Sequence, residues 1–335
     1  MGLARRLVRN TVLNRSVQVA VLLWAALNLA AILLARGHLP FDRPALAGKP
    51  FAFQMALPTL GLLEVFLLMA VTYWLTSRRA IPDIAARAPE RPLAARETMM
   101  VLAYAALGQA VGGVLGPALG YRPFSFHIAG TLVGSSAPPS SGEICTWAVY
   151  GFVVYALVPY LWFRRRYTST QLNLRSTNRM NDLIVILVVG AIEAGVELGT
   201  FPGFFKLTGT QLFAGAPLAF GLFLLGTVLP TMVIIHVILV PRYLKLTGSF
   251  ATTVLLGGLT YAGMHVVEGW QVFKSPDTAA LSLIFVVLQY MGPGMVKTFL
   301  TLRTGNAWVH VFGYHAFAPH VVVDTPLVVH AFGIQ

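Results

Sequence analysis

Long apolar stretches recur along the whole chain, and they limit its fold more than any other feature. A transmembrane helix needs about 20 mostly apolar residues, and the sequence holds nine stretches near that length. With 56% hydrophobic and 11% charged residues among 335, the chain is too apolar for an ordinary soluble domain. We therefore predict an all-α, polytopic transmembrane helix bundle of eight or nine spans. The nine stretches are residues 17–35, 55–76, 98–120, 146–163, 182–200, 217–240, 250–267, 278–300 and 306–323.

Basic side chains gather in the connections between these stretches, mainly in every second connection. Eighteen of the 24 Lys and Arg residues fall on the side of the N-terminus, and cytoplasmic loops of membrane proteins are enriched in these residues. We therefore predict a multi-pass protein of the bacterial inner (plasma) membrane with a cytoplasmic N-terminus. Because the charges serve as a topology signal, the net charge of +12 does not indicate nucleic acid as a partner.

No internal repeat divides the chain. We predict N-terminal transmembrane spans with basic cytoplasmic loops in residues 1–159, followed by a transmembrane core in residues 160–335. The first apolar stretch lacks a cleavage site, so we expect it to remain as a span rather than to act as a signal peptide. The single cysteine, Cys145, excludes an internal disulfide and a cysteine-based metal cluster. The pattern leaves open whether residues 325–335 are helical.

Glycines recur every four residues in the stretch 98–120, at Gly108, Gly112, Gly116 and Gly120. On a helix this spacing lines them along one face, where a neighbouring backbone can approach closely. We predict that this face makes a helix contact inside the protein. A dimer contact is the alternative.

Three glutamates lie within apolar stretches, where an ionisable side chain is costly and therefore suggests a function. Glu64 is in the middle of its stretch, whereas Glu193 and Glu197 are four residues apart and share one face of a helix. Two carboxyl groups on one face could hold a proton or a metal ion. The alternative is a hydrated Glu197 near the membrane surface and a Glu193 that is neutral or paired with a neighbouring span.

Histidines are the second kind of polar group in the apolar stretches. A helix is expected from Leu302 to Asp324, and in it His310, His315 and His320 are five residues apart. Each step of five turns an α-helix by about 140°, so no two of these histidines share a face. A metal site on this helix alone is not expected, because such sites use residues four apart.

Any metal site must therefore draw on several helices, with His236, His265 and His315 as the natural ligands. Glu268 follows His265 by three residues, so on a continuous helix it would lie on the same face and could act as a ligand or base. Histidines that hydrogen-bond within the bundle are the structural alternative, and two histidines on facing spans could hold haem. The histidines to which we assign no role, because they lie in loops or at the end of the chain, are His38, His127 and His330.

Four short motifs stand out in the second half of the chain. They are Leu300–Trp308 followed by His315–Ala316, Tyr261–His265, Val240–Leu244 and Gln171–Arg175. In order and spacing they resemble the Leu-Arg-Thr-Gly-Ser/Asn-x-Trp entry with His-Ala-x-x-Asn, the Phe-x-x-x-His motif, the Leu-Pro-Arg-Leu turn and the Leu-Gly-Leu-Arg entry of one family. That family is the CAAX-protease and bacteriocin-processing (CPBP) family of intramembrane proteases. The resemblance covers about residues 160–324 and implies an intramembrane endopeptidase.

The family's catalytic glutamates have no counterpart here. Counted back from Pro241, its Glu-Glu-x-x-x-Arg motif would fall on Thr231 and Met232, with His236 in place of the arginine. In the family, a glutamate helped by a histidine activates water. A threonine hydroxyl without a nearby base cannot accept a proton at neutral pH, and losing a general base typically costs about 10²–10⁴-fold in rate.

Of the other residues that the family uses, His265 and His315 remain, while Pro319 stands at the position of the final asparagine. Loss of a donor to the oxyanion costs about a further 10²–10³-fold. Hydrolysis could survive only in a rebuilt active site, in which Glu268 or Glu193 takes over as the base.

These observations favour a catalytically degenerate, protease-like membrane protein that acts as a binding, scaffold or regulatory subunit. An active intramembrane endopeptidase with a rebuilt His/Glu site is the alternative, and a haem-binding or transporter subunit is the third interpretation. The expected partners are the lipid bilayer and another membrane protein or a peptide. No cofactor is required, and a divalent metal on the three histidines named above stays open.

Overall fold

Helices make up all the regular secondary structure in the part of the chain that the structure describes. The structure, a computed structural model, describes residues 14–41, 48–128 and 138–335. Seven helices within these ranges are long and apolar enough to cross a membrane, so the predicted all-α bundle of apolar, membrane-length helices is confirmed, while the predicted number of eight or nine spans stays a prediction. The seven helices are Arg15–Ala35, Phe51–Leu75, Arg91–Ala118, Ser141–Arg164, Arg179–Thr200, Gly209–Thr247 and Pro276–Thr304.

Two of these long helices, Ser141–Arg164 and Gly209–Thr247, are composite, because α-helical pieces alternate in them with π-helical pieces. The π-helical pieces among the described residues are η3 (Phe152–Leu157), η5 (Leu224–Val228), η6 (Met232–Leu239), η7 (Val311–His315) and η8 (Ala318–Val323). The elements in chain order are α2 (Arg15–Ala35), α3 (Phe51–Leu75), η2 (Ala85–Arg87), α4 (Arg91–Ala118), α5 (Ser141–Gly151), η3 (Phe152–Leu157), α6 (Val158–Arg164), α7 (Arg179–Thr200), η4 (Pro202–Lys206), α8 (Gly209–Phe223), η5 (Leu224–Val228), α9 (Leu229–Thr231), η6 (Met232–Leu239), α10 (Val240–Thr247), α11 (Phe250–Gly263), α12 (Pro276–Thr304), α13 (Trp308–His310), η7 (Val311–His315), η8 (Ala318–Val323) and α14 (Thr325–Ala331).

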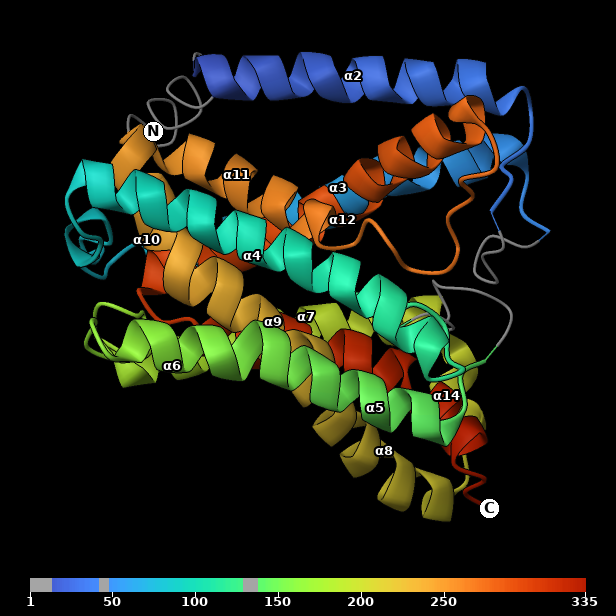
Figure 1. Cartoon of the computed structure of the whole chain (residues 1–335). Coiled ribbons are helices and arrows are strands. Elements are labelled where there is room, and N and C mark those ends of the chain that lie inside the picture. The colour runs from blue at the N-terminus through green and yellow to red at the C-terminus, as the bar shows by residue number, and fades with distance from the viewer. Residues whose placement is uncertain (1–13, 42–47, 129–137) are drawn as a thin grey trace.

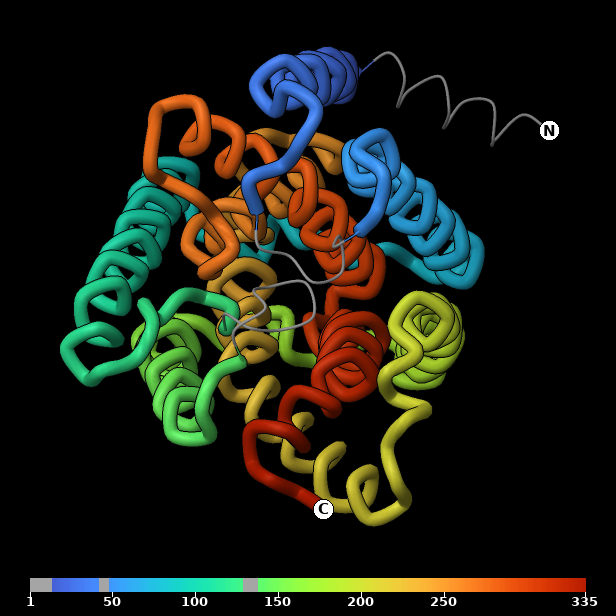
Figure 2. The backbone as a smooth tube through the Cα atoms, turned by 90° about the vertical axis from the view of Figure 1, so that its right-hand side faces the viewer, coloured from blue at the N-terminus to red at the C-terminus, as the bar shows by residue number. Residues whose placement is uncertain are grey.

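The helices differ greatly in how deeply they lie within the bundle. Helix α2 lies along its outer edge (Figure 1), and only 6% of its apolar window is buried. The composite helix Gly209–Thr247 is the opposite case, with 83% of its window buried. Its part η6 is buried at every residue and lies near the middle of the tube view (Figure 2). The core is therefore built around η6, the element that carries His236.

Proline explains where the central helices widen. A proline follows two residues after the end of η3, η5 and η6, at Pro159, Pro230 and Pro241. Proline cannot donate to the helix ladder, and its ring clashes with the carbonyl four residues earlier. In the turn before each of these prolines the hydrogen bonds shift from i→i+4 to i→i+5, as in other π-bulges, and this shift relieves the clash.

The last third of the chain departs from the predicted spans. Leu302 belongs to α12, which ends at Thr304 because Gly305 adopts a left-handed conformation with φ +65°. The prediction of a helix that begins at Leu302 was therefore wrong. Helix α11 has 14 residues and ends at Gly263, short of the predicted end at residue 267. After α13 the chain continues as separate short helices, and α14 shows that residues 325–331 are helical.

The glycine face of α4 packs inside the protein, as predicted. A side chain at Gly108 would overlap the Tyr155 ring of η3, and one at Gly112 or Gly116 would overlap the main chain of residues 122–124. Gly120 follows the helix with φ +78°. The chain therefore turns back after α4 and lies against the helix that it has just left.

Arginines tie one end of the bundle together, which we call the arginine-rich end. Arg87 donates to the Asn173 side chain at 2.6 Å and to the Gly305 carbonyl at 2.7 Å. Asn173 in turn donates to the carbonyl of His236 at 2.8 Å, and its own carbonyl accepts from the Ala307 amide at 2.7 Å. These bonds join the start of the last helical segment to η6.

A second set of bonds at the arginine-rich end involves Asp182. Its carboxylate accepts from Arg79 at 2.6 Å and from the Asn306 side chain at 2.9 Å, while Arg303 donates to the hydroxyl of Thr76 at 2.8 Å. Asn306 and Arg303 belong to the Leu-Arg-Thr-Gly-Asn motif. In this protein the polar residues of that motif hold helix ends in place.

Candidate functional site

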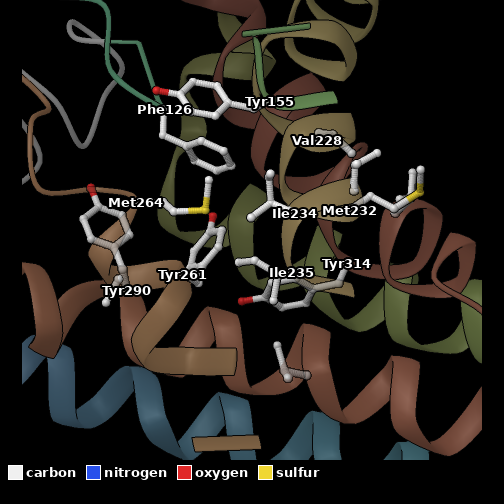
Figure 3. Packing of buried hydrophobic residues seen from close by; sticks show 14 of the residues in the cluster. Phe126, Tyr155, Val228, Met232, Ile234, Ile235, Tyr261, Met264, Tyr290 and Tyr314 are labelled. Carbon is white, nitrogen blue, oxygen red and sulfur yellow. The ribbon is translucent and has the colours of Figure 1, made fainter. Parts of the chain in front are cut away.

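The positions of the family's glutamate pair lie deep in the bundle and hold no acid. Thr231 is fully buried, and its hydroxyl donates to the Thr227 carbonyl at 2.8 Å. Met232 beside it is 4% exposed and is seen in the core packing of Figure 3. Neither side chain can accept a proton from water at neutral pH.

The histidines five residues apart do line up, contrary to the α-helical prediction. His310, His315 and His320 lie in or directly before π-helical turns, and the Ala316 amide bonds to the Val311 carbonyl five residues back at 2.8 Å. In a helix with i→i+5 bonds, residues five apart come close to one face. The ring centroids are 6.3 Å apart for His310 and His315, and 5.2 Å apart for His315 and His320.

Three further histidines extend this row at both ends. The ring of His236 lies 3.9 Å from that of His310, which leaves no room for a porphyrin between them. At the other end, His127 lies 5.3 Å from His320 and 5.8 Å from His265, centroid to centroid. We call the six buried rings the histidine cluster: His127, His236, His265, His310, His315 and His320.

The predicted trio of His236, His265 and His315 all belong to the cluster but are not direct neighbours. His310 contacts both His236 and His315, and the Tyr261 ring lies between His315 and His265, at 6.0 and 4.3 Å from them. A single metal ion on the three predicted rings would need these intervening side chains to move. The trio as a ligand set stays a prediction.

His265 and Glu268 lie together, but for a different reason from the one expected. Helix α11 ends at Gly263, so the two residues lie in the turn beyond it rather than on a shared helical face. His265 Nε2 is 3.6 Å from Glu268 Oε1, and both side chains are buried. Glu268 also accepts hydrogen bonds from Trp270 Nε1 at 3.0 Å and from the Tyr290 hydroxyl.

His127 reaches the interior because the segment after α4 enters the bundle. The Phe124 amide donates to the Gly112 carbonyl at 2.9 Å, and Trp147 Nε1 donates to the Ser125 carbonyl at 3.0 Å. The next side chain, Phe126, meets the Tyr155 ring (Figure 3) at 5.4 Å. The role of His127 was missed because loop position alone gives no signal of burial.

His127 completes a group that sequence reasoning did not assemble. One ligand atom each from His127, His320 and Asp324 can be chosen so that all three lie within 4.8 Å of one another. His320 Nδ1 and Asp324 Oδ2 are 2.8 Å apart, and all three residues are buried. The spacing of four residues between His320 and Asp324 is the signal that could have found this pair.

The intramembrane carboxyl groups pair between helices rather than along one. Glu193 of α7 is 3% exposed, and its carboxyl group interacts with that of Glu64 of α3. Glu197, its expected partner, is half-buried. Lys297 of α12 is within electrostatic range of Glu193, and its Nζ atom lies 3.7 Å from the centroid of the Tyr261 ring. The predicted pairing of Glu193 with a neighbouring span is the interpretation that fits.

The fold and this interior define a helical membrane protein with a buried histidine cluster. Comparison of the chain with protein-family models, curated proteins and solved structures finds no match. The similarity to the CAAX-protease and bacteriocin-processing family therefore rests on the motifs of the sequence and stays a prediction.

Proposed function

We propose that this chain is a non-proteolytic membrane protein that resembles the intramembrane proteases and uses its histidine cluster for binding. The observation that carries the proposal is the state of Thr231, whose buried hydroxyl is bound to a main-chain carbonyl where the family would have a catalytic glutamate. With Met232 as the second member of the pair, water has no base at this place.

The unpaired ring nitrogens support a binding role. Neither nitrogen of His236, His310 or His315 has a hydrogen-bond partner among the described residues. Buried polar atoms in proteins are nearly always paired, and exceptions call for a bound ion, water or ligand. Three such rings within one cluster of six support an interior that accommodates a ligand.

The charge pattern supports a placement in the membrane. We infer a multi-pass protein of the bacterial inner membrane whose arginine-rich end and N-terminus face the cytoplasm, because basic loops are retained on that side. The partner regulated by ligand binding would be another membrane protein or a membrane peptide, since the outer helix α2 exposes large apolar side chains such as Leu22 and Leu33.

Peptide hydrolysis is the second candidate, and the pair of His265 and Glu268 favours it. A carboxylate 3.6 Å from a buried imidazole could serve as a rebuilt base, a role that typically contributes about 10²–10⁴-fold. Glu193 is less suited to this role because its carboxyl group already interacts with that of Glu64.

A cleavage assay separates the two candidates. Membrane proteins from cells that produce the wild type or the Glu268→Gln variant are compared for new protein N-termini by mass spectrometry, with the Glu197→Gln variant as the control. We expect the same set of N-termini in all three. A product made by the wild type and by Glu197→Gln, but lost in Glu268→Gln, would establish hydrolysis and overturn the proposal.

A further inference from the structure

We infer that His127, His320 and Asp324 form a binding site for a transition-metal ion of the zinc type. This inference does not depend on whether the interior cleaves peptides, because it concerns bound metal alone. The residues come from two segments far apart in the sequence: the loop that follows α4, and the helical turn η8 with the residue after it.

The spacing of the donor atoms is close to what such an ion needs. Zinc bonds to imidazole nitrogen and carboxylate oxygen are about 2.0–2.2 Å long in a tetrahedral site, which places neighbouring ligand atoms about 3.4 Å apart. The three donors lie within 4.8 Å of one another. Small side-chain rotations would therefore bring them to bonding distance without moving the helices.

Two buried atoms of this group have no partner and are available to a cation. His320 Nε2 and Asp324 Oδ1 are buried and have no hydrogen-bond partner among the described residues. The remaining pair, His320 Nδ1 and Asp324 Oδ2, is 2.8 Å apart. An ion bound through Nδ1 or Oδ2 would displace the proton that these two atoms share and release it, whereas an ion bound through Nε2 and Oδ1 would leave that proton in place.

The surroundings hold the ligands firmly in place. The Phe223 ring stacks on His320 with a centroid distance of 4.7 Å and an interplanar angle of 12°. The main chain beside His127 is fixed by the bonds from Phe124 to Gly112 and from Trp147 to Ser125. An apolar shell of this kind strengthens the attraction between a carboxylate and a cation.

The donor set selects the class of metal. Two imidazoles and one carboxylate suit Zn²⁺ and similar first-row ions, whereas Mg²⁺ prefers oxygen ligands and keeps much of its water. The carboxylate offsets half of the charge of a divalent ion. Three protein ligands leave a fourth position for water or for a group from the bound partner.

The test measures metal bound to the full-length protein in detergent. The protein is stripped with a chelator, exposed to Zn²⁺, Co²⁺ or Mg²⁺ and freed of excess metal, and the metal content is read by mass spectrometry. We expect about one Zn²⁺ or Co²⁺ per chain, no retained Mg²⁺, and a Co²⁺ absorption spectrum typical of tetrahedral coordination. Less than a fifth of one Zn²⁺ per chain would overturn the inference.

Four variants locate the ion. His320→Ala and Asp324→Asn should weaken zinc binding by at least about 100-fold, since even partners of metal ligands contribute 10–100-fold. The exposed His330→Ala should bind as the wild type does, and the buried His315→Ala separates this site from the rest of the histidine cluster. Asp324→Asn keeps the size of the side chain, so we expect its melting temperature without zinc to equal that of the wild type. Zinc should no longer stabilise this variant. The two results together would exclude misfolding as the cause of the lost binding. Zinc lost in His315→Ala but kept in His320→Ala would place the ion elsewhere and contradict the site.

Discussion

The carboxylate of Glu97 in α4 accepts two hydrogen bonds from Arg242 in α10, from Nε at 2.8 Å and from Nη2 at 2.6 Å. Both side chains are buried, with 4% and 1% of their surface exposed. Tyr167 donates to the same carboxylate at 2.8 Å, and its burial raises the pKa of the Tyr167 phenol. The arginine of the Val-Pro-Arg-Tyr motif thus joins the predicted core to the N-terminal helices.

Replacing Glu97 by Gln should destabilise the protein strongly. The substitution leaves the Arg242 guanidinium buried without a counter-charge, and breaking a buried pair in this way typically costs about 3–5 kcal/mol. Thermal unfolding in detergent measures the loss. Glu90→Gln, an exposed position just before the same helix, is the control and should melt like the wild type. Equal melting temperatures for the two variants would show that the ion pair contributes little.

Asn173 should tolerate glycine better than alanine. Its φ is +54°, a left-handed conformation that costs a residue with a Cβ roughly 1–2 kcal/mol. Both substitutions remove the bonds to His236 and Arg87, so both should lower the melting temperature. The alanine variant should lose about 1 kcal/mol more. An alanine variant as stable as the glycine variant would mean that the loop adopts another conformation.

Apolar stretches and basic connections were sufficient to predict the helices, because hydrocarbon forces the backbone to satisfy its own hydrogen bonds. They were also sufficient to place polar residues in the interior. They could not predict the angle around the helix axis that separates one of these residues from the next. The angle between His310 and His315 depends on whether the turn is α or π, and this depends on prolines and on packing.

Contacts between residues far apart in the sequence were the second feature that could not be predicted. Nothing near Glu64 in the sequence indicates that its partner is Glu193, and nothing near His127 indicates that this loop enters the bundle. Both follow from how α3, α4 and α7 pack, which a single sequence does not encode locally. By contrast, His320 and Asp324 are four residues apart, and this local signal was available.

The close contact at Gly112 gives a prediction with a control one residue away. A Cβ at Gly112 would overlap the Phe124 carbonyl, whereas a Cβ at Gly113 meets nothing within 4 Å. Gly112→Ala should therefore cost about 1–3 kcal/mol through overpacking, and Gly113→Ala should be neutral or stabilise by up to about 1 kcal/mol. Thermal unfolding of the two variants measures the difference.

The same pair of variants also tests the metal site. Displacement of Phe124 should move His127, so Gly112→Ala should bind zinc more weakly than Gly113→Ala at a temperature where both are folded. Equal zinc affinities would show that the position of His127 does not depend on the contact between α4 and the segment that follows it.

The carboxyl groups of Glu193 and Glu64 interact in the interior, so we expect them to share one proton, because two carboxylates would repel each other. Glutamine at position 193 can donate an amide N–H in place of that proton, so Glu193→Gln should keep the stability of the wild type. Glu193→Ala removes the interaction and leaves a buried polar group unpaired, which costs about 1–3 kcal/mol. Glu197→Ala, one turn further along α7 and half-buried, should have little effect. Thermal unfolding of the three variants measures these differences. If Glu193→Gln lowers the melting temperature as much as Glu193→Ala does, the charge of the carboxylate is itself needed, and its partner is then the ammonium group of Lys297.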